Sequence, residues 1–136
     1  MRYFLAKTEP SSYSIGQLRS EQHTLWDGVR NPQALRAIRD MSPGDRVLIY
    51  HSGGDSAIVG WAEVISPPQT DPKDEKSAAV ELQFGGLIEP HVTLKEIKTT
   101  HAFDDWSLVR QSRLSTMAVP ETFVKWLKKQ NAALPF

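Results

Sequence analysis

The sequence predicts a mixed α+β fold in which about five or six short strands form a curved or closed β-barrel with short helices at its flanks. Apolar strand-like runs alternate with short segments at helical spacing, and clusters of Gly, Pro, Ser and Asp separate them. The 136 residues indicate one domain spanning 1–136. A chain of this length buries roughly two-thirds of its unfolded surface, which is enough for a hydrophobic core.

Helices are predicted mainly from capping residues. Ser14 and Gln17 have the spacing of a capping box, and Asn31 followed by Pro32 suits an N-cap and the first helical position. In the last helix, Phe123, Trp126 and Leu127 share one apolar face, so Trp126 is expected in the core. Helices are therefore expected at about 15–20, 32–41, 94–99 and 121–129.

Strands are predicted where apolar and β-branched residues cluster or alternate. Gly60, inside one of these runs, suggests a bulge or a close backbone approach, and Gly85-Gly86 is expected to turn the chain. Three segments are expected to form loops or irregular structure: 21–31, 66–77 and 102–119. The expected strands are 2–7, 46–51, 58–65, 78–84 and 91–94.

The amino-acid composition excludes several classes of site and of function. The absence of Cys removes disulfides, thiolate metal sites and thiol nucleophiles, and no apolar run is long enough to span a membrane. The net charge is zero, but residues 1–46 carry +2, residues 47–105 carry −6 and residues 106–136 carry +4. A neutral protein is unlike one that coats DNA. If its two basic ends meet, however, they form a local basic face suited to a specific pocket with backbone contacts.

The segment Trp26-Asp27-Gly28-Val29-Arg30-Asn31 carries more polar and aromatic chemistry than a turn requires. Trp26 offers a flat surface on which a base stacks, and the alternative is a Trp in the core. Asn31 either reads a base edge through paired hydrogen bonds or caps the helix that follows. The segment predicts a pocket for one planar ring, most simply a nucleobase.

Short sequence blocks in the same order as in a known family run along nearly the whole chain. By these blocks the sequence resembles the EVE domain family, although it departs from the family pattern at Pro32, at Leu35 and between Asp71 and Val80. The blocks are Phe4-Leu5-Ala6-Lys7-Thr8-Glu9-Pro10, Tyr13-Ser14, Trp26 to Asn31, Gly44 to Leu48, Tyr50-His51-Ser52, Val59 to Val64, Leu108-Val109-Arg110, Ser112 to Ser115, and Val119.

The resemblance implies a PUA-like β-barrel related to the YTH domain, which holds a methylated adenine in an aromatic cage. It also implies a non-catalytic module that recognises a modified base in DNA or RNA and needs no cofactor or metal. A stand-alone protein of this length resembles bacterial family members, for which a cytoplasmic location is expected, whereas a eukaryotic one would be nuclear. A monomer with a nucleic-acid partner and no membrane is the expected state.

Two groups of side chains are candidates for the binding site. Base contacts are expected from residues near strand ends or inside strands, and phosphate contacts from Arg and Ser residues. Each has an ordinary alternative: a solvated Arg, a Ser bonded to local backbone, a His bonded to neighbouring backbone, a Lys in an ion pair with Glu9, or a Trp that fills the barrel. Besides Trp26 and Asn31, the base candidates are Lys7, Tyr50, His51, Ser52 and Trp61. The phosphate candidates are Arg30, Arg110, Ser112 and Arg113.

Two other classes of function compete with a base reader. A small enzyme acting on a nucleotide would need a catalytic constellation, but His51-Ser52-Gly53-Gly54 does not match the Gly-x-Ser-x-Gly nucleophile elbow. The four His residues show no metal-binding spacing, and no P-loop is present. A protein-interaction module would need an exposed amphipathic tract, and the sequence offers none that requires this function.

Overall fold

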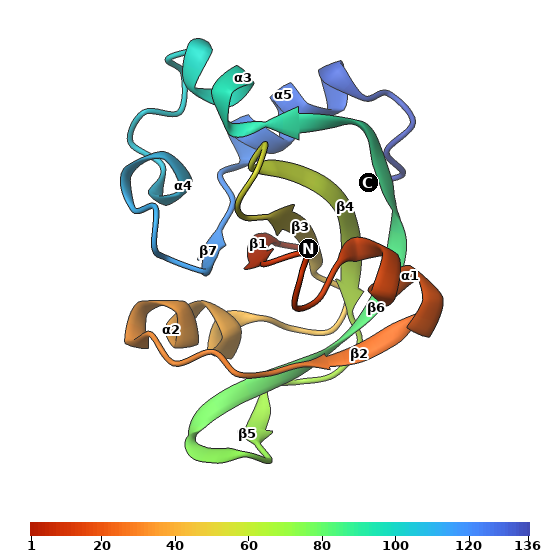
Figure 1. The fold of residues 1–136 in the computed structure, drawn as a ribbon, viewed down its shortest axis with the longest axis vertical. Helices are drawn as coiled ribbons and strands as arrows, with labels where there is room; N and C mark the ends of the chain where they lie inside the picture. Colours follow the sequence, from red (N-terminus) through yellow and green to blue (C-terminus); the bar gives the residue numbers. More distant parts are fainter.

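A computed structural model describes residues 1–136 and shows one curved sheet of seven strands with five short helices around it (Figure 1). Along the sheet the strand order is β2-β6-β4-β3-β1-β7, with β5 attached to β6. β1 and β3 are parallel, and the other pairs are antiparallel. The strands are β1 (Tyr3–Thr8), β2 (His23–Trp26), β3 (Arg46–His51), β4 (Ala57–Val64), β5 (Gln69–Asp71), β6 (Asp74–Thr93) and β7 (Thr116–Ala118).

The predicted α+β fold is confirmed, but the sheet does not close into a barrel. β2 and β7 lie at the two ends of the strand order and do not pair with each other, so a seam remains between them. Helix α2 (Pro32–Asp40) follows β2 and packs on β7 across part of this seam (Figure 1). The remaining part of the seam lies beside the C-terminal half of β1.

The helices begin where the capping residues predict. The Ser14–Gln17 capping box starts α1 (Ile15–Glu21), and the Asn31 side chain caps α2 by accepting from the backbone N–H groups of Gln33 and Ala34 at 2.8 and 3.1 Å. Because caps depend only on neighbouring residues, they are readable from the sequence. The other helices are α3 (Leu94–Thr99), α4 (Ser107–Arg110) and α5 (Glu121–Gln130).

The predicted turn at Gly85-Gly86 is wrong, because these residues lie within the 20-residue strand β6. The indole of Trp61 on β4 covers them: a Cβ added at Gly85 would lie 2.4 Å from its ring carbons. These glycines therefore make room for a side chain. Gly60 is also a close approach, since an added Cβ would lie 2.6 Å from Ile15 Cδ1, and the β4–β6 register shifts beside it, as the sequence predicts.

Three predicted loops or irregular segments contain regular structure. Residues 21–31 include β2, residues 66–77 include β5 and the start of β6, and residues 102–119 include α4 and β7. β5 and β6 form a hairpin that extends beyond the rest of the sheet (Figure 1). These strands are short or polar, and pairing with distant partners specifies them better than their own sequence does.

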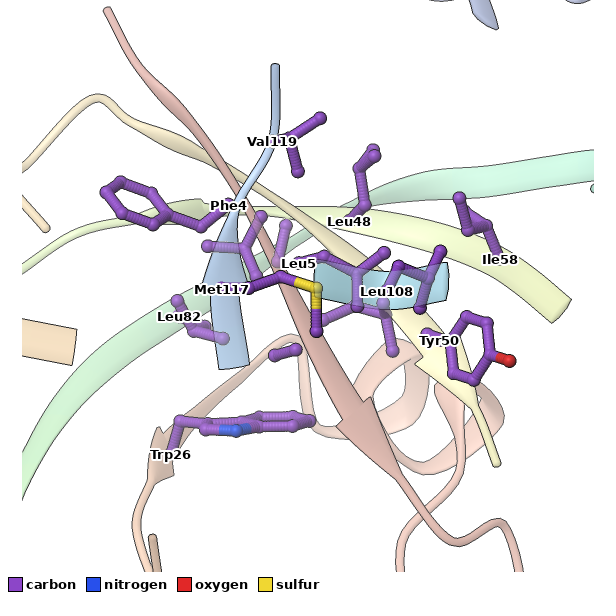
Figure 2. Packing of buried hydrophobic residues seen from close by; sticks show 14 of the residues in the cluster. Phe4, Leu5, Trp26, Leu48, Tyr50, Ile58, Leu82, Leu108, Met117 and Val119 are labelled. Carbon is purple, nitrogen blue, oxygen red and sulfur yellow. The ribbon is translucent and has the colours of Figure 1, made fainter. Parts of the chain in front are cut away.

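A single cluster of buried apolar side chains fills the space between the sheet and the helices (Figure 2). Trp106 is part of this core: its indole N–H donates to the Ala118 carbonyl at 3.0 Å and its ring packs on Phe103 and Phe123. Trp126 is half-buried and packs on the same two Phe rings. Trp26 lies at the edge of the cluster in Figure 2. No helix is both long and apolar enough to cross a membrane.

Candidate functional site

A cavity of about 330 Å³ lies at the open seam of the sheet, beside Trp26. One wall comes from edge strand β2 and the loop after it, and the opposite wall comes from the end of β1 and from Ser115, directly before edge strand β7. Its volume is near the lower end of the roughly 300–1,000 Å³ found for small-molecule sites. The lining residues are Lys7, Thr8, Tyr13, Thr24, Leu25, Trp26, Asp27, Gly28, Val29, Arg30 and Ser115.

Trp26 belongs both to the core and to this cavity. Its side chain keeps 9% of its surface exposed and borders the cavity. The Tyr13 ring packs edge-to-face against it, with centroids 6.0 Å apart and planes at 84°. The Tyr13 hydroxyl donates to Glu21, and burial together with this carboxylate raises the pKa of Tyr13 to about 12. Tyr13 therefore remains a neutral donor at physiological pH.

The charged side chains of the cavity have few internal partners. Arg30 is largely exposed and contacts Asp74 only at 3.5 Å, while the Asp27 carboxylate forms no hydrogen bond or ion pair within the chain. Lys7 Nζ donates to the Ser112 carbonyl at 3.0 Å, and burial lowers its pKa. The cavity thus presents cationic donors and one free carboxylate acceptor beside an aromatic surface.

The β5–β6 hairpin holds the loop that carries these groups. Asp71 accepts from the Gly28 N–H at 3.0 Å, where Gly28 has a φ of +76° that suits Gly. The Ser77 hydroxyl donates to the Val29 carbonyl at 2.6 Å, and Asp74 faces Arg30. Two backbone hydrogen bonds, to Gly28 and to Lys73, lower the pKa of Asp71, so it stays ionised as an acceptor.

The two basic ends of the chain meet, which was the condition for a local basic face. β1 pairs with β7, the Lys7 N–H donates to the Ser115 carbonyl at 2.7 Å, and its ammonium reaches Ser112. Of the predicted site residues, this arrangement brings together Lys7, Trp26 and Arg30. Arg113 is exposed two residues before Ser115 and has no ion pair, and Arg110 is exposed and faces Asp105 at 3.4 Å.

Asn31 and Trp61 do not line the cavity. The Asn31 side-chain oxygen is used by the α2 cap, which was the alternative to reading a base edge. Trp61 lies elsewhere on the sheet, where its ring meets Phe136 at 5.1 Å between centroids and lies beneath the Arg46 guanidinium at 5.5 Å. Packing against the C-terminal residue and over Gly85 accounts for this Trp.

Tyr50, His51 and Ser52 form a supporting layer outside the cavity. Lys7 Nζ lies 5.4 Å from the centre of the buried Tyr50 ring, and burial raises the pKa of this phenol. His51 Nε2 accepts from the Ile15 N–H at 3.0 Å at the start of α1, which was the structural alternative for this His. The Ser52 N–H and hydroxyl both donate to the Thr8 carbonyl.

Several lining residues were missed as individual candidates. Thr24 and Leu25 were hidden because β2 was expected to be loop. Thr8 and Tyr13 belong to blocks that resemble the family, and that resemblance was the available signal for them. The structure places no group of three or more His, Cys, Asp or Glu side chains where they could hold a metal ion.

An open, curved α+β sheet with a cavity at its seam is the PUA-like type of fold, and it has close counterparts. A Rhodopseudomonas palustris protein solved by NMR is 33% identical with a TM-score of 0.91 and coverage of 100% of this chain and 97% of that chain. Human THYN1, crystallised with DNA containing 5-methylcytosine, has a TM-score of 0.86 at 24% identity and 96% and 98% coverage. The YTH domain of Mmi1 shares the fold at a TM-score of 0.58.

The EVE domain family model matches residues 2–130, and the chain belongs to this family. Mouse thymocyte nuclear protein 1 is 32% identical over 127 residues, which cover 73% of this chain and 56% of the mouse protein. The chain therefore spans about half the length of the curated relatives it matches. The EVE family expected from the sequence is confirmed, and the fold is similar to that of a YTH domain.

Proposed function

We propose that this protein is a nucleic-acid-binding module that accepts one modified base in the seam cavity, with Trp26 as the stacking surface. The observation that carries the proposal is the cavity itself: an aromatic wall, cationic Lys7 and Arg30 and the free carboxylate of Asp27 surround about 330 Å³. The human relative crystallised with DNA containing 5-methylcytosine supports the same class of ligand. Stacking of a base on an aromatic side chain contributes about 1–3 kcal/mol.

Asp27 suggests which bases fit. A carboxylate only accepts hydrogen bonds, and cytosine, adenine and guanine present an exocyclic amino group as a donor, whereas thymine and uracil have none. Because Asp27 has no partner within the chain, its oxygens are available to a ligand. A derivative of one of the three amino-bearing bases therefore suits the cavity better than a thymine or uracil derivative.

Binding explains the site better than catalysis does. The His of the proposed catalytic alternative would need a free ring nitrogen within reach of its substrate. His51 Nε2 is engaged by the Ile15 N–H, and His51 does not line the cavity. The side chains that do border the cavity offer stacking, hydrogen bonds and charge.

The proposal is tested by titrating labelled oligonucleotides that contain cytosine, 5-methylcytosine, adenine or N6-methyladenine, as DNA and as RNA. We expect one modified form to bind most tightly and Trp26→Leu to weaken that complex about tenfold or more through lost stacking. Leu keeps the site apolar, so circular dichroism should show a folded variant. Trp126→Leu, on α5 away from the cavity, is the matched control.

Equal affinity of the wild-type protein for all these oligonucleotides would refute base recognition. A folded Trp26→Leu variant that binds as tightly as the wild type would refute the stacking role. Every oligonucleotide is expected to bind more tightly at low salt, because Lys7 and Arg30 would contact phosphate.

A further inference from the structure

A second hollow is lined by chain neighbours of the residues that line the seam cavity. It has a volume of about 410 Å³ and lies between α2 and the extended segment 114–118. Consecutive residues of one extended segment line the two hollows: Ser115 borders the first, and its neighbours Leu114 and Thr116 border the second. The other wall of the seam cavity ends at Arg30, and the chain then enters α2, which lines the second hollow. We call the second hollow the α2 trough.

The α2 trough has an apolar floor and one polar helix face. Phe4, Leu114 and Met117 lie beneath it and are almost completely buried, so Ala37 and Ala118 supply its accessible apolar surface. The α2 residues that line it are spaced i, i+3, i+4 and i+7, which places them on one side of the helix. They are Gln33, Arg36, Ala37 and Asp40, whereas Leu35 and Ile38 face the core.

The cation of the α2 trough has no partner. Arg36 is exposed and forms no hydrogen bond or ion pair within the chain. By contrast, Arg39 on the same helix donates to the Lys76 carbonyl at 3.1 Å. Asp40 is one turn further along α2, away from the cavity, so the end of the trough nearest the cavity carries Arg36 and Gln33. That end suits an anion linked to a ligand in the cavity.

Building on the proposed function, we infer that the α2 trough holds the neighbouring nucleotide of the strand whose modified base occupies the seam cavity. Arg36 contacts the phosphate that joins the two nucleotides, and the apolar floor receives the adjoining sugar or base. A free nucleoside fills the first hollow only, whereas a dinucleotide fills both. The ligand is therefore a base within a strand, and Arg36 adds a contact that a strand makes and a nucleoside lacks.

The test compares a nucleoside with a dinucleotide by isothermal titration calorimetry. The probes are 5-methylcytidine and N6-methyladenosine and dinucleotides that carry one such base on either side of a single phosphate, in deoxyribose and ribose forms. We expect Arg36→Gln to weaken the better dinucleotide about fivefold and to leave nucleoside affinity unchanged. The slope of log affinity against log salt should fall by about 0.7, as for one lost phosphate contact on a single strand.

Arg19→Gln is the matched control, because it removes the same charge from an exposed position on α1 outside both hollows. If the wild-type protein binds nucleoside and dinucleotide equally, or if Arg36→Gln keeps wild-type dinucleotide affinity, the inference is refuted while base binding stands. If the wild-type protein binds neither probe in any form, the proposed function fails and the inference fails with it. The deoxyribose and ribose arms show whether the strand is DNA or RNA.

Discussion

Removing the Ser77 hydroxyl should loosen the wall of the seam cavity. Ser77 is 5% exposed and donates to the Val29 carbonyl at 2.6 Å, and Val29 lines the cavity. The Val29 carbonyl forms no other hydrogen bond within the chain. In Ser77→Ala it becomes a buried acceptor without a partner. Leaving a buried acceptor unsatisfied costs about 1–3 kcal/mol, so the free energy of unfolding should fall by that amount.

Thermal and urea unfolding measure this change. For a domain of 136 residues, the loss corresponds to a Tm lowered by about 3–10 °C. Base affinity should fall as well: if the loop keeps its binding geometry only a third of the time, the apparent Kd rises about threefold. Ser42→Ala is the control, because Ser42 is exposed and its hydroxyl forms no hydrogen bond.

A Ser77→Ala protein whose stability stays within about 0.5 kcal/mol of the wild type would refute this reasoning, since surface substitutions commonly have effects of that size. It would mean that water replaces the hydroxyl at Val29. An unchanged base affinity with reduced stability would separate the two roles, and would show that the hairpin stabilises the fold without shaping the cavity.

Two further predictions concern the rest of the molecule. Gly85→Ala should lower the free energy of unfolding by about 1–3 kcal/mol in a urea titration while base affinity stays unchanged, because its Cβ would overlap the Trp61 ring, away from the cavity. Stability should also fall as the pH drops below about 6.5. Burial and the nearby His91 lower the pKa of His51 in the folded protein, so the unfolded chain binds the proton first. Urea titrations at pH 7.5 and 5.5 should show this loss in the wild type and in His23→Gln, but not in His51→Gln.

The parts of the fold that the sequence predicts well are those governed by adjacent residues. Ser14 and Gln17 cap α1, and Asn31 and Pro32 begin α2, through contacts within one helical turn. The apolar runs of β1 and β3 need no partner to be recognised as strands. β2 is different: its four residues include two polar ones, and antiparallel pairing with residues 80–83 of β6 makes it a strand.

The residues of the candidate site likewise fall into those that the local sequence marks and those that it does not. The segment around Trp26 stands out because its chemistry exceeds what a turn needs, and Trp26 and Arg30 do line the cavity. Its supports do not stand out, because Asp71 and Ser77 are ordinary polar residues in a stretch expected to be an exposed loop. Their importance comes from contacts across more than 40 residues, which no local pattern records.

The open seam explains why the cavity lies where it does. Edge strands leave unpaired backbone groups, and proteins normally cover them. Here α2 covers β7 on one side, while Lys7 and Ser115 pair only at the end of β1, so β2 and β7 stay apart beside Trp26. In a closed barrel these two edges would pair with each other and occupy this space. The failure of the sheet to close is therefore what leaves an aromatic surface accessible between two polar edges, with the α2 trough, in which we place the second nucleotide, lined by the chain segments that follow on from those edges.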